Sequence, residues 1–210
     1  MVRKIVEKVP DKVLHDDLEK YRQRALTLGA TDAKIITTDM ILIDERVRAK
    51  CIYPKCGNYG TNANCPPYAM DLDQVRKVVN NYRYAIFLRL EVPATEIAST
   101  EQKVRVTSQR KNHEIVSRLE AEAFYDGYHL ALGFAGGPCK RSFCPDVECQ
   151  ALIPGQGCRH PLRARSAMEA VGMNAFTMAA NVGWDIYPVG RSTQPADVPH
   201  GNRLGLVLIY

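Results

Sequence analysis

Apolar residues recur at helical or strand spacing along most of the chain, and these periods predict its regular elements. Leu14, Leu18, Tyr21 and Ala25 would share one face of a helix that Gly29 ends. The same patterns predict helices over 11–28, 71–80, 99–125, 161–172 and 174–183, and strands over 33–37, 84–92, 128–134 and 204–210. Because helices and strands alternate, we expect an α/β or α+β fold with a mixed sheet flanked by helices. The length of 210 residues fits one domain over residues 1–210.

Two predicted helices carry a start signal in the sequence. Asp71 with Gln74 and Ser99 with Gln102 have the spacing of a capping box, in which each side chain binds the other residue's backbone N–H. The charged stretch 44–50 has no clear period, and the pattern assigns it to no element.

Seven cysteines fall into two groups with the same internal spacing. The first group contains Cys51, Cys56 and Cys65, the second contains Cys144, Cys149 and Cys158, and Cys139 precedes the second group. In both groups, four and then eight residues separate successive cysteines. Glycine and proline are frequent around them, so residues 51–68 and 136–161 are predicted to form irregular metal-binding loops.

The compartment decides how these thiols are interpreted. The chain begins with a charged segment where a secretory signal would be apolar, and no apolar run is long enough for a membrane span. We therefore expect a cytoplasmic protein without a membrane partner. Cytosolic thiols stay reduced, so the cysteines are predicted to be metal ligands rather than disulfides. Structural zinc usually uses closely spaced cysteine pairs, and C-x2-C is absent here, which favours iron–sulfur clusters.

The extra cysteine leaves two ligand assignments open. If Cys139 joins the second group, that group has four thiolates, and the first group leaves one iron for a non-cysteine ligand, a partner's cysteine or a substrate. If Cys139 instead completes the first cluster, the second has the open iron. His160 is then the nearest candidate in the sequence for its fourth ligand.

The charge balance is mildly basic, with 28 Lys and Arg against 23 Asp and Glu. This excess is too small and too evenly spread to indicate a nucleic-acid partner. A local concentration of cations lies beside the second cysteine group: Lys140, Arg141, Arg159, Arg163 and Arg165. These side chains could stabilise a negatively charged cluster or form a solvated basic face, and Lys140, Arg141 and Arg163 could hold a small anionic substrate.

Two long segments carry a resemblance to a known family. The segments KCIYPKCGNYGTNANCPPY and GFAGGPCKRSFCPDVECQALIPGQGCRHPLRARSAMEAVGMN contain all seven cysteines. At these residues the chain resembles a family of predicted metal-binding proteins, domain of unknown function 2284, found largely in anaerobic bacteria and methanogenic archaea. The likeness extends over nearly the whole chain. It implies metal binding at the seven cysteines and an anaerobic setting, and it supplies no reaction.

Three functions follow from these features. The first is an electron-transfer protein of anaerobic redox metabolism that carries two four-iron four-sulfur clusters and meets a redox partner protein. The second is an enzyme of lyase, desulfidase or reductase type that binds an anionic substrate at the open iron of a three-cysteine cluster. The third is a zinc-stabilised interaction module. No phosphate loop, dinucleotide fingerprint or nucleophile elbow points to another reaction, and the sequence leaves self-association open.

Overall fold

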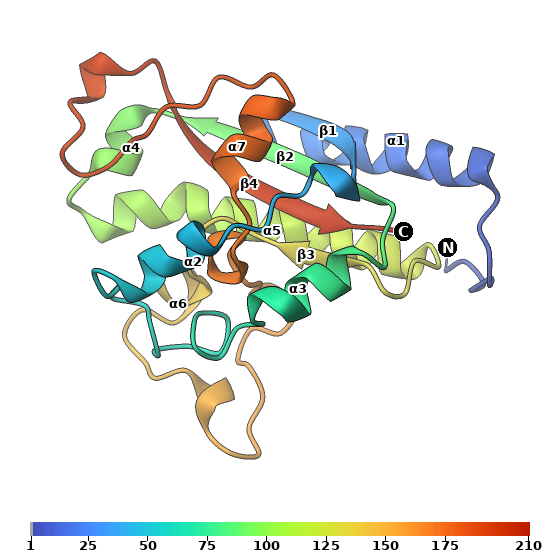
Figure 1. The fold of residues 1–210 in the computed structure, drawn as a ribbon, viewed down its shortest axis with the longest axis horizontal. Coiled ribbons are helices and arrows are strands. Elements are labelled where there is room, and N and C mark those ends of the chain that lie inside the picture. Colours follow the sequence, from blue (N-terminus) through green and yellow to red (C-terminus); the bar gives the residue numbers. More distant parts are fainter. Residues whose placement is uncertain (1) are drawn as a thin grey trace.

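The computed structural model describes residues 2–210 and has a four-stranded sheet at its centre (Figure 1). The strands are β1 (Asp32–Thr37), β2 (Tyr84–Val92), β3 (Leu132–Phe134) and β4 (Gly201–Leu208). They lie in the order β1-β2-β4-β3, and every neighbouring pair is antiparallel. The expected α+β class is confirmed, but the sheet is not mixed. The described residues have one parallel pairing, the isolated bridge between Ala135 and Ala167.

Helices cover both faces of this sheet. They are α1 (Asp11–Thr27), α2 (Glu45–Ile52), α3 (Leu72–Val79), α4 (Ala94–Ala98), α5 (Gln102–Tyr125), α6 (Cys139–Phe143) and α7 (Ala175–Asn181). Side chains alternate between the faces along each strand, so Ile86 of β2 packs with α1 and α5, whereas Phe87 packs with α3 and α7. Both are fully buried, which explains why β2 is almost continuously apolar.

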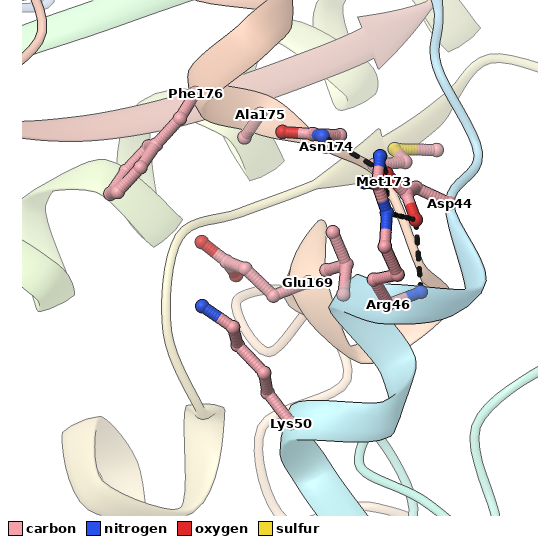
Figure 2. A pocket seen from close by; sticks show the side chains of 9 residues that line it. Asp44, Arg46, Lys50, Glu169, Met173, Asn174, Ala175 and Phe176 are labelled. Carbon is pink, nitrogen blue, oxygen red and sulfur yellow. Dashed lines mark hydrogen bonds and ion pairs between the residues drawn. The ribbon is translucent and has the colours of Figure 1, made fainter.

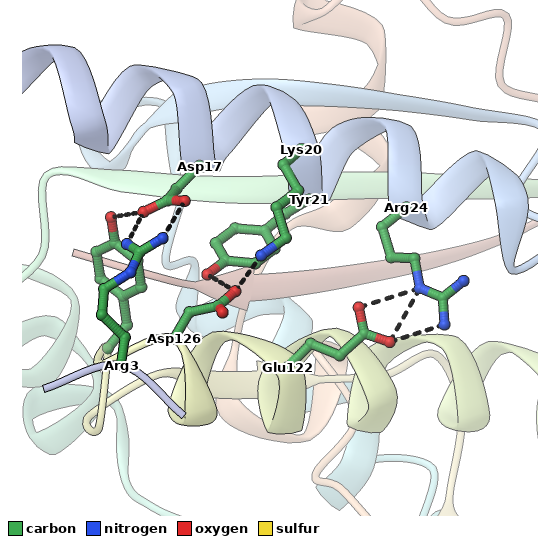
Figure 3. A network of polar contacts seen from close by, with 8 residues as sticks. Arg3, Asp17, Lys20, Tyr21, Arg24, Glu122 and Asp126 are labelled. Atoms are coloured by element: carbon green, nitrogen blue, oxygen red, sulfur yellow. Dashed lines mark hydrogen bonds and ion pairs between the residues drawn. The ribbon is translucent and has the colours of Figure 1, made fainter. Parts of the chain in front are cut away.

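Buried and half-buried ion pairs join α1 to α5 and to the start of the chain (Figure 3). The Asp17 carboxylate pairs with the Arg3 guanidinium and accepts the Tyr128 hydroxyl at 2.7 Å. Two helical turns further along, the Arg24 Nε donates to the Glu122 carboxylate of α5 at 2.9 Å. Charge-assisted hydrogen bonds are the stronger kind, so α5 is held firmly against the rest of the domain.

The sequence signals for helix starts were right at one site and wrong at the other. Asp71 and Gln74 make the predicted capping box, which confirms the start of α3. Ser99 and Gln102 do not make one, because α5 begins after Glu101 and the Ser99 hydroxyl accepts the Glu101 amide at 3.1 Å instead.

Three other elements differ from the sequence prediction. The stretch without a clear period, 44–50, belongs to α2, which has no fully buried residue and therefore no apolar stripe to detect. The predicted helix over 161–172 is absent from the described chain, where turns lead into a short 3₁₀ segment, Glu169–Val171. β3 has only three residues of the predicted 128–134. Within residues 2–210, no helix combines the length and the apolar character needed to cross a membrane.

Candidate metal centre

Four cysteines surround a single cavity of about 200 Å³ at one end of the molecule. They are Cys139, Cys144, Cys149 and Cys158. Cys139 begins the short helix α6, and the other three lie in the turns that follow it. Cys139 thus lines one cavity with the second cysteine group, and Cys65 of the first group also lies close enough to affect the pKa of Cys139. His160 also lines this cavity, and its backbone N–H points to the Cys158 Sγ at 3.3 Å.

Residues of the first cysteine segment complete this cavity. The Asn64 side-chain N–H donates to the Cys139 Sγ at 3.3 Å, and Asn62 lies 3.7 Å from the same sulfur. Asn64 is in turn held by the Ser166 hydroxyl at 3.1 Å. Figure 1 shows both cysteine segments at the same end of the fold, below α2 and α3. The two segments, far apart in sequence, therefore form one region.

A row of buried polar side chains on α5 fixes the entrance to the second segment. The Gln109 amide donates to the Pro138 carbonyl at 2.7 Å and to the Ser142 hydroxyl at 2.8 Å. The Asn112 Oδ1 accepts the Gly136 amide at 2.7 Å. Buried polar groups need such partners, so these residues hold the backbone on either side of Cys139. Sequence reasoning missed them, because only their position on an otherwise apolar helix face could have pointed to a buried partner.

His113 connects both ends of the second cysteine segment to α5. Its Nε2 donates to the Gly137 carbonyl at 3.1 Å, and its Nδ1 lies 3.4 Å from the Arg165 amide. A carbonyl can only accept, so the proton belongs on Nε2 and the ring is neutral. Burial in this setting lowers the pKa of His113 to about 4.

This pKa predicts an acid-sensitive fold. An unfolded histidine has a pKa of about 6.5, so protonation favours the unfolded chain as the pH falls below that value, by up to about 3 kcal/mol near pH 4. We expect the thermal unfolding temperature to decline between these pH values. The decline should be smaller in His113→Gln, which keeps a donor for Gly137 but does not titrate. Equal declines in the two proteins would show that His113 is not responsible, since acid effects on other groups are common to both.

The cations near the second group are largely engaged within the protein. Lys140 donates to the Cys144 carbonyl at 2.9 Å, and Arg159 donates to the Glu148 carbonyl. Arg163 and Arg165 form ion pairs with Glu114 and Glu120 of α5, the latter at 2.6 Å. Arg141 has no ion pair in residues 2–210. The cationic groups thus help to fold the loop, which leaves Arg141 as the free member of the trio proposed for an anionic substrate.

The first cysteine group is built around the end of α2. The Asp44 side chain caps this helix by accepting the Arg46 amide at 2.9 Å, and Arg48 anchors it by donating to the Met70 carbonyl at 3.0 Å. Cys51 lies in the last turn, and the Cys56 amide donates to the Cys51 carbonyl at 3.1 Å. These contacts position Cys51 and Cys56 although α2 has no buried apolar stripe.

Two of the seven cysteines, Cys65 and Cys139, are buried and the others are partly exposed, and this burial affects their chemistry. Burial raises the pKa of Cys139 to about 11, and it also raises the pKa of Cys65 and of Cys51, with a further upward contribution from neighbouring thiols. Buried thiolates without a compensating cation are unfavourable. A metal supplies that positive charge, so the donor set fits a thiolate-ligated metal group.

The cysteines do not converge on a point. Within residues 2–210, no three His, Cys, Asp or Glu side chains are placed to hold a single metal ion. The four thiols instead surround a space several times the roughly 30 Å³ that one water occupies in the liquid. The side chains that could hold a cofactor are therefore spread around a cavity.

The fold and this region define an α+β protein of the metal-binding class. A family model described as predicted metal-binding protein (DUF2284) matches residues 34–209. The chain belongs to this family. No curated protein and no solved structure matches the chain significantly.

Proposed function

We propose that this protein is a cytoplasmic iron–sulfur protein with two four-iron four-sulfur clusters that transfers electrons in anaerobic redox metabolism. One cluster would be held by Cys139, Cys144, Cys149 and Cys158, and the other by Cys51, Cys56 and Cys65. When bound, such clusters accept and release one electron at a time. The position of Cys139 in the four-cysteine cavity is the observation that carries this proposal.

The arrangement of donors favours clusters over single zinc ions. Zinc in structural sites draws four ligands into a tight tetrahedron, with Zn–S distances of about 2.3 Å. A cluster is larger and needs thiolates around a wider space, and four cysteines line one cavity of about 200 Å³ here. N–H groups directed at sulfur also suit a cluster, because hydrogen bonds to the sulfurs adjust its potential. The Asn64 contact with the Cys139 Sγ is of this kind.

Electron transfer is supported by how closely the two groups adjoin. Asn62 lies beside the Cys139 Sγ and is also hydrogen-bonded to Cys65 of the first group, so a single side chain separates the groups at this point. An electron entering one cluster would have the other as its neighbour. Donor and acceptor would be redox partner proteins that dock at this end of the molecule.

Metal analysis after anaerobic purification tests this function. We expect about eight irons and eight sulfides per chain, and a paramagnetic signal after reduction. Stoichiometric zinc without iron would overturn the proposal and favour the zinc-stabilised interaction module. If reduced ferredoxin, a physiological type of reductant, fails to produce the paramagnetic signal, the role of electron carrier would be contradicted.

A second candidate is an enzyme that binds substrate at the first cluster. Three cysteines remain there, and Glu169 lies close enough to Cys51 and Cys65 to raise the pKa of both thiols. An iron without a cysteine ligand could bind a substrate of the lyase, desulfidase or reductase type. Adding a small anion such as sulfide to the reduced protein should then shift only one cluster's signal. No shift would favour the plain carrier.

A further inference from the structure

A cleft separate from the cysteine cavity runs between α2, α7 and β4. It consists of an outer cavity of about 440 Å³ and an inner cavity of about 160 Å³, which share Glu169 and Phe176 as lining residues. Figure 2 shows the outer cavity, with the Glu169 and Lys50 side chains extending in the same direction and ending near each other. Pockets that bind small molecules are concave and carry a few directed polar groups, as this one does.

The charges of Glu169 and Lys50 are not paired with another side chain in the described residues, although the Glu169 carboxylate accepts backbone N–H groups of Glu169 and Gly137. Glu169 keeps an exposed surface, but that surface faces the two cavities, and burial by the surrounding protein raises the pKa of its carboxyl group. Neither Glu169 nor Lys50 takes part in an ion pair in residues 2–210. Arg46, in contrast, is held by Asp44 at 2.8 Å. One negative and one positive group are therefore both available to a ligand.

The inner cavity adds an acceptor and apolar surface. The Asn202 Oδ1 is buried there without a hydrogen-bond partner, and an unsatisfied buried acceptor is unfavourable until a donor reaches it. Arg203 is fixed nearby by the Ser108 hydroxyl at 3.1 Å. Phe176, although 51% exposed, lines both cavities and offers an apolar surface. The cleft thus presents an anion, a cation and an aromatic ring, and the Asn202 Oδ1 is buried in the wall of its inner part.

We propose that this cleft binds a small zwitterion of the amino-acid class. The ligand ammonium would donate to the Glu169 carboxylate, the ligand carboxylate would pair with Lys50, and an apolar side chain would lie against Phe176. A simple amine would leave Lys50 unpaired and a simple acid would leave Glu169 unpaired, so a molecule with both charges fits best. This site uses no cysteine and goes beyond the proposed electron transfer.

Calorimetric titration of the full chain, purified anaerobically, tests the site. The probes are the protein amino acids one at a time, followed by the amine and the acid that match the tightest binder. We expect saturable binding of at least one amino acid and at least tenfold weaker binding of both analogues. Glu169→Gln and Lys50→Met should each weaken binding at least tenfold, because each leaves one ligand charge unpaired.

Matched controls separate this site from the clusters and from general charge effects. Asp16→Asn and Lys12→Met make the same charge changes on the exposed side of α1 and should leave affinity unchanged. Iron content should not change in Lys50→Met or in the two control variants, so loss of binding by Lys50→Met with full iron isolates the cleft. Lys50 is exposed on α2, so its replacement tests the site even if Glu169→Gln folds poorly.

Three results would overturn the assignment. The first is no saturable binding of any amino acid up to about 10 mM. The second is an affinity that neither Glu169→Gln nor Lys50→Met reduces. The third is equal affinity for the amino acid and its amine, which would show that Lys50 does not pair with a carboxylate. None of these results depends on whether the clusters carry electrons, which the iron, sulfide and paramagnetic measurements decide separately.

Discussion

Replacement of Cys139 with serine is expected to remove one cluster and to leave the other, which cuts bound iron and sulfide to about half. Cys139 is only 7% exposed and lines the four-cysteine cavity, so a serine there leaves the second group with three thiolates. Iron and sulfide analysis, together with the spectrum of the reduced protein, measures this loss.

A background variant decides which cluster Cys139 serves. In a chain whose other second-group cysteines are all alanine, only the first group can hold iron. These positions are Cys144, Cys149 and Cys158. Adding Cys139→Ser to that chain should not change its iron content. A further fall in iron would mean that Cys139 belongs to the first group, and the ligand assignment proposed above would then be wrong.

The second large effect is expected from Gly136→Ala. An alanine Cβ at this position would lie 2.8 Å from the Leu204 backbone oxygen of β4, which is closer than real Cβ atoms come. A strand backbone in the middle of a sheet cannot move aside, so the peptide before Cys139 must shift and strain its bond to Asn112. Overpacking of this kind typically costs about 1–3 kcal/mol. Thermal unfolding at equal iron content measures the cost, and we also expect weaker retention of the second cluster.

Gly157→Ala is the matched control in the same cysteine segment. No heavy atom lies within 4 Å of the alanine Cβ built at Gly157, and its backbone does not have a positive φ. The expected change in stability is within about 0.5 kcal/mol. Equal destabilisation by the two variants would indicate that the segment is sensitive to any added methyl group, rather than to the contact of Gly136 with β4.

The sequence predicted elements that bury an apolar stripe and missed those held by polar contacts. Helix α1 and strand β2 were predicted correctly because their apolar residues pack against the sheet core. Helix α2 was missed, since it is held by the local Asp44 cap and by hydrogen bonds from Arg48 to the distant Met70 and Ala170 carbonyls. The helix expected over 161–172 is absent because that segment follows the polar face of α5, where His113 and Arg165 fix turns instead.

In the candidate site too, the sequence predicted some features and missed those that depend on contacts between distant residues. Spacing alone predicted two cysteine groups and left Cys139 unassigned, and only the folded chain shows that Cys139 lies near Cys158 and Cys149 and also near Cys65 of the first group. Glu169 had no signal at all, since a lone carboxylate after a turn carries no pattern. Its role in a cleft depends on Lys50, more than a hundred positions away in sequence, and such a pairing becomes visible only in the folded chain.

Asn62 and Asn64 make the second cysteine segment depend on the first. The four-cysteine cavity is lined partly by these two side chains of the first segment, so its wall is complete only when the first segment is folded. A change in the conformation of residues 62–64 would therefore alter the surroundings of Cys139 as well as those of the first cysteine group.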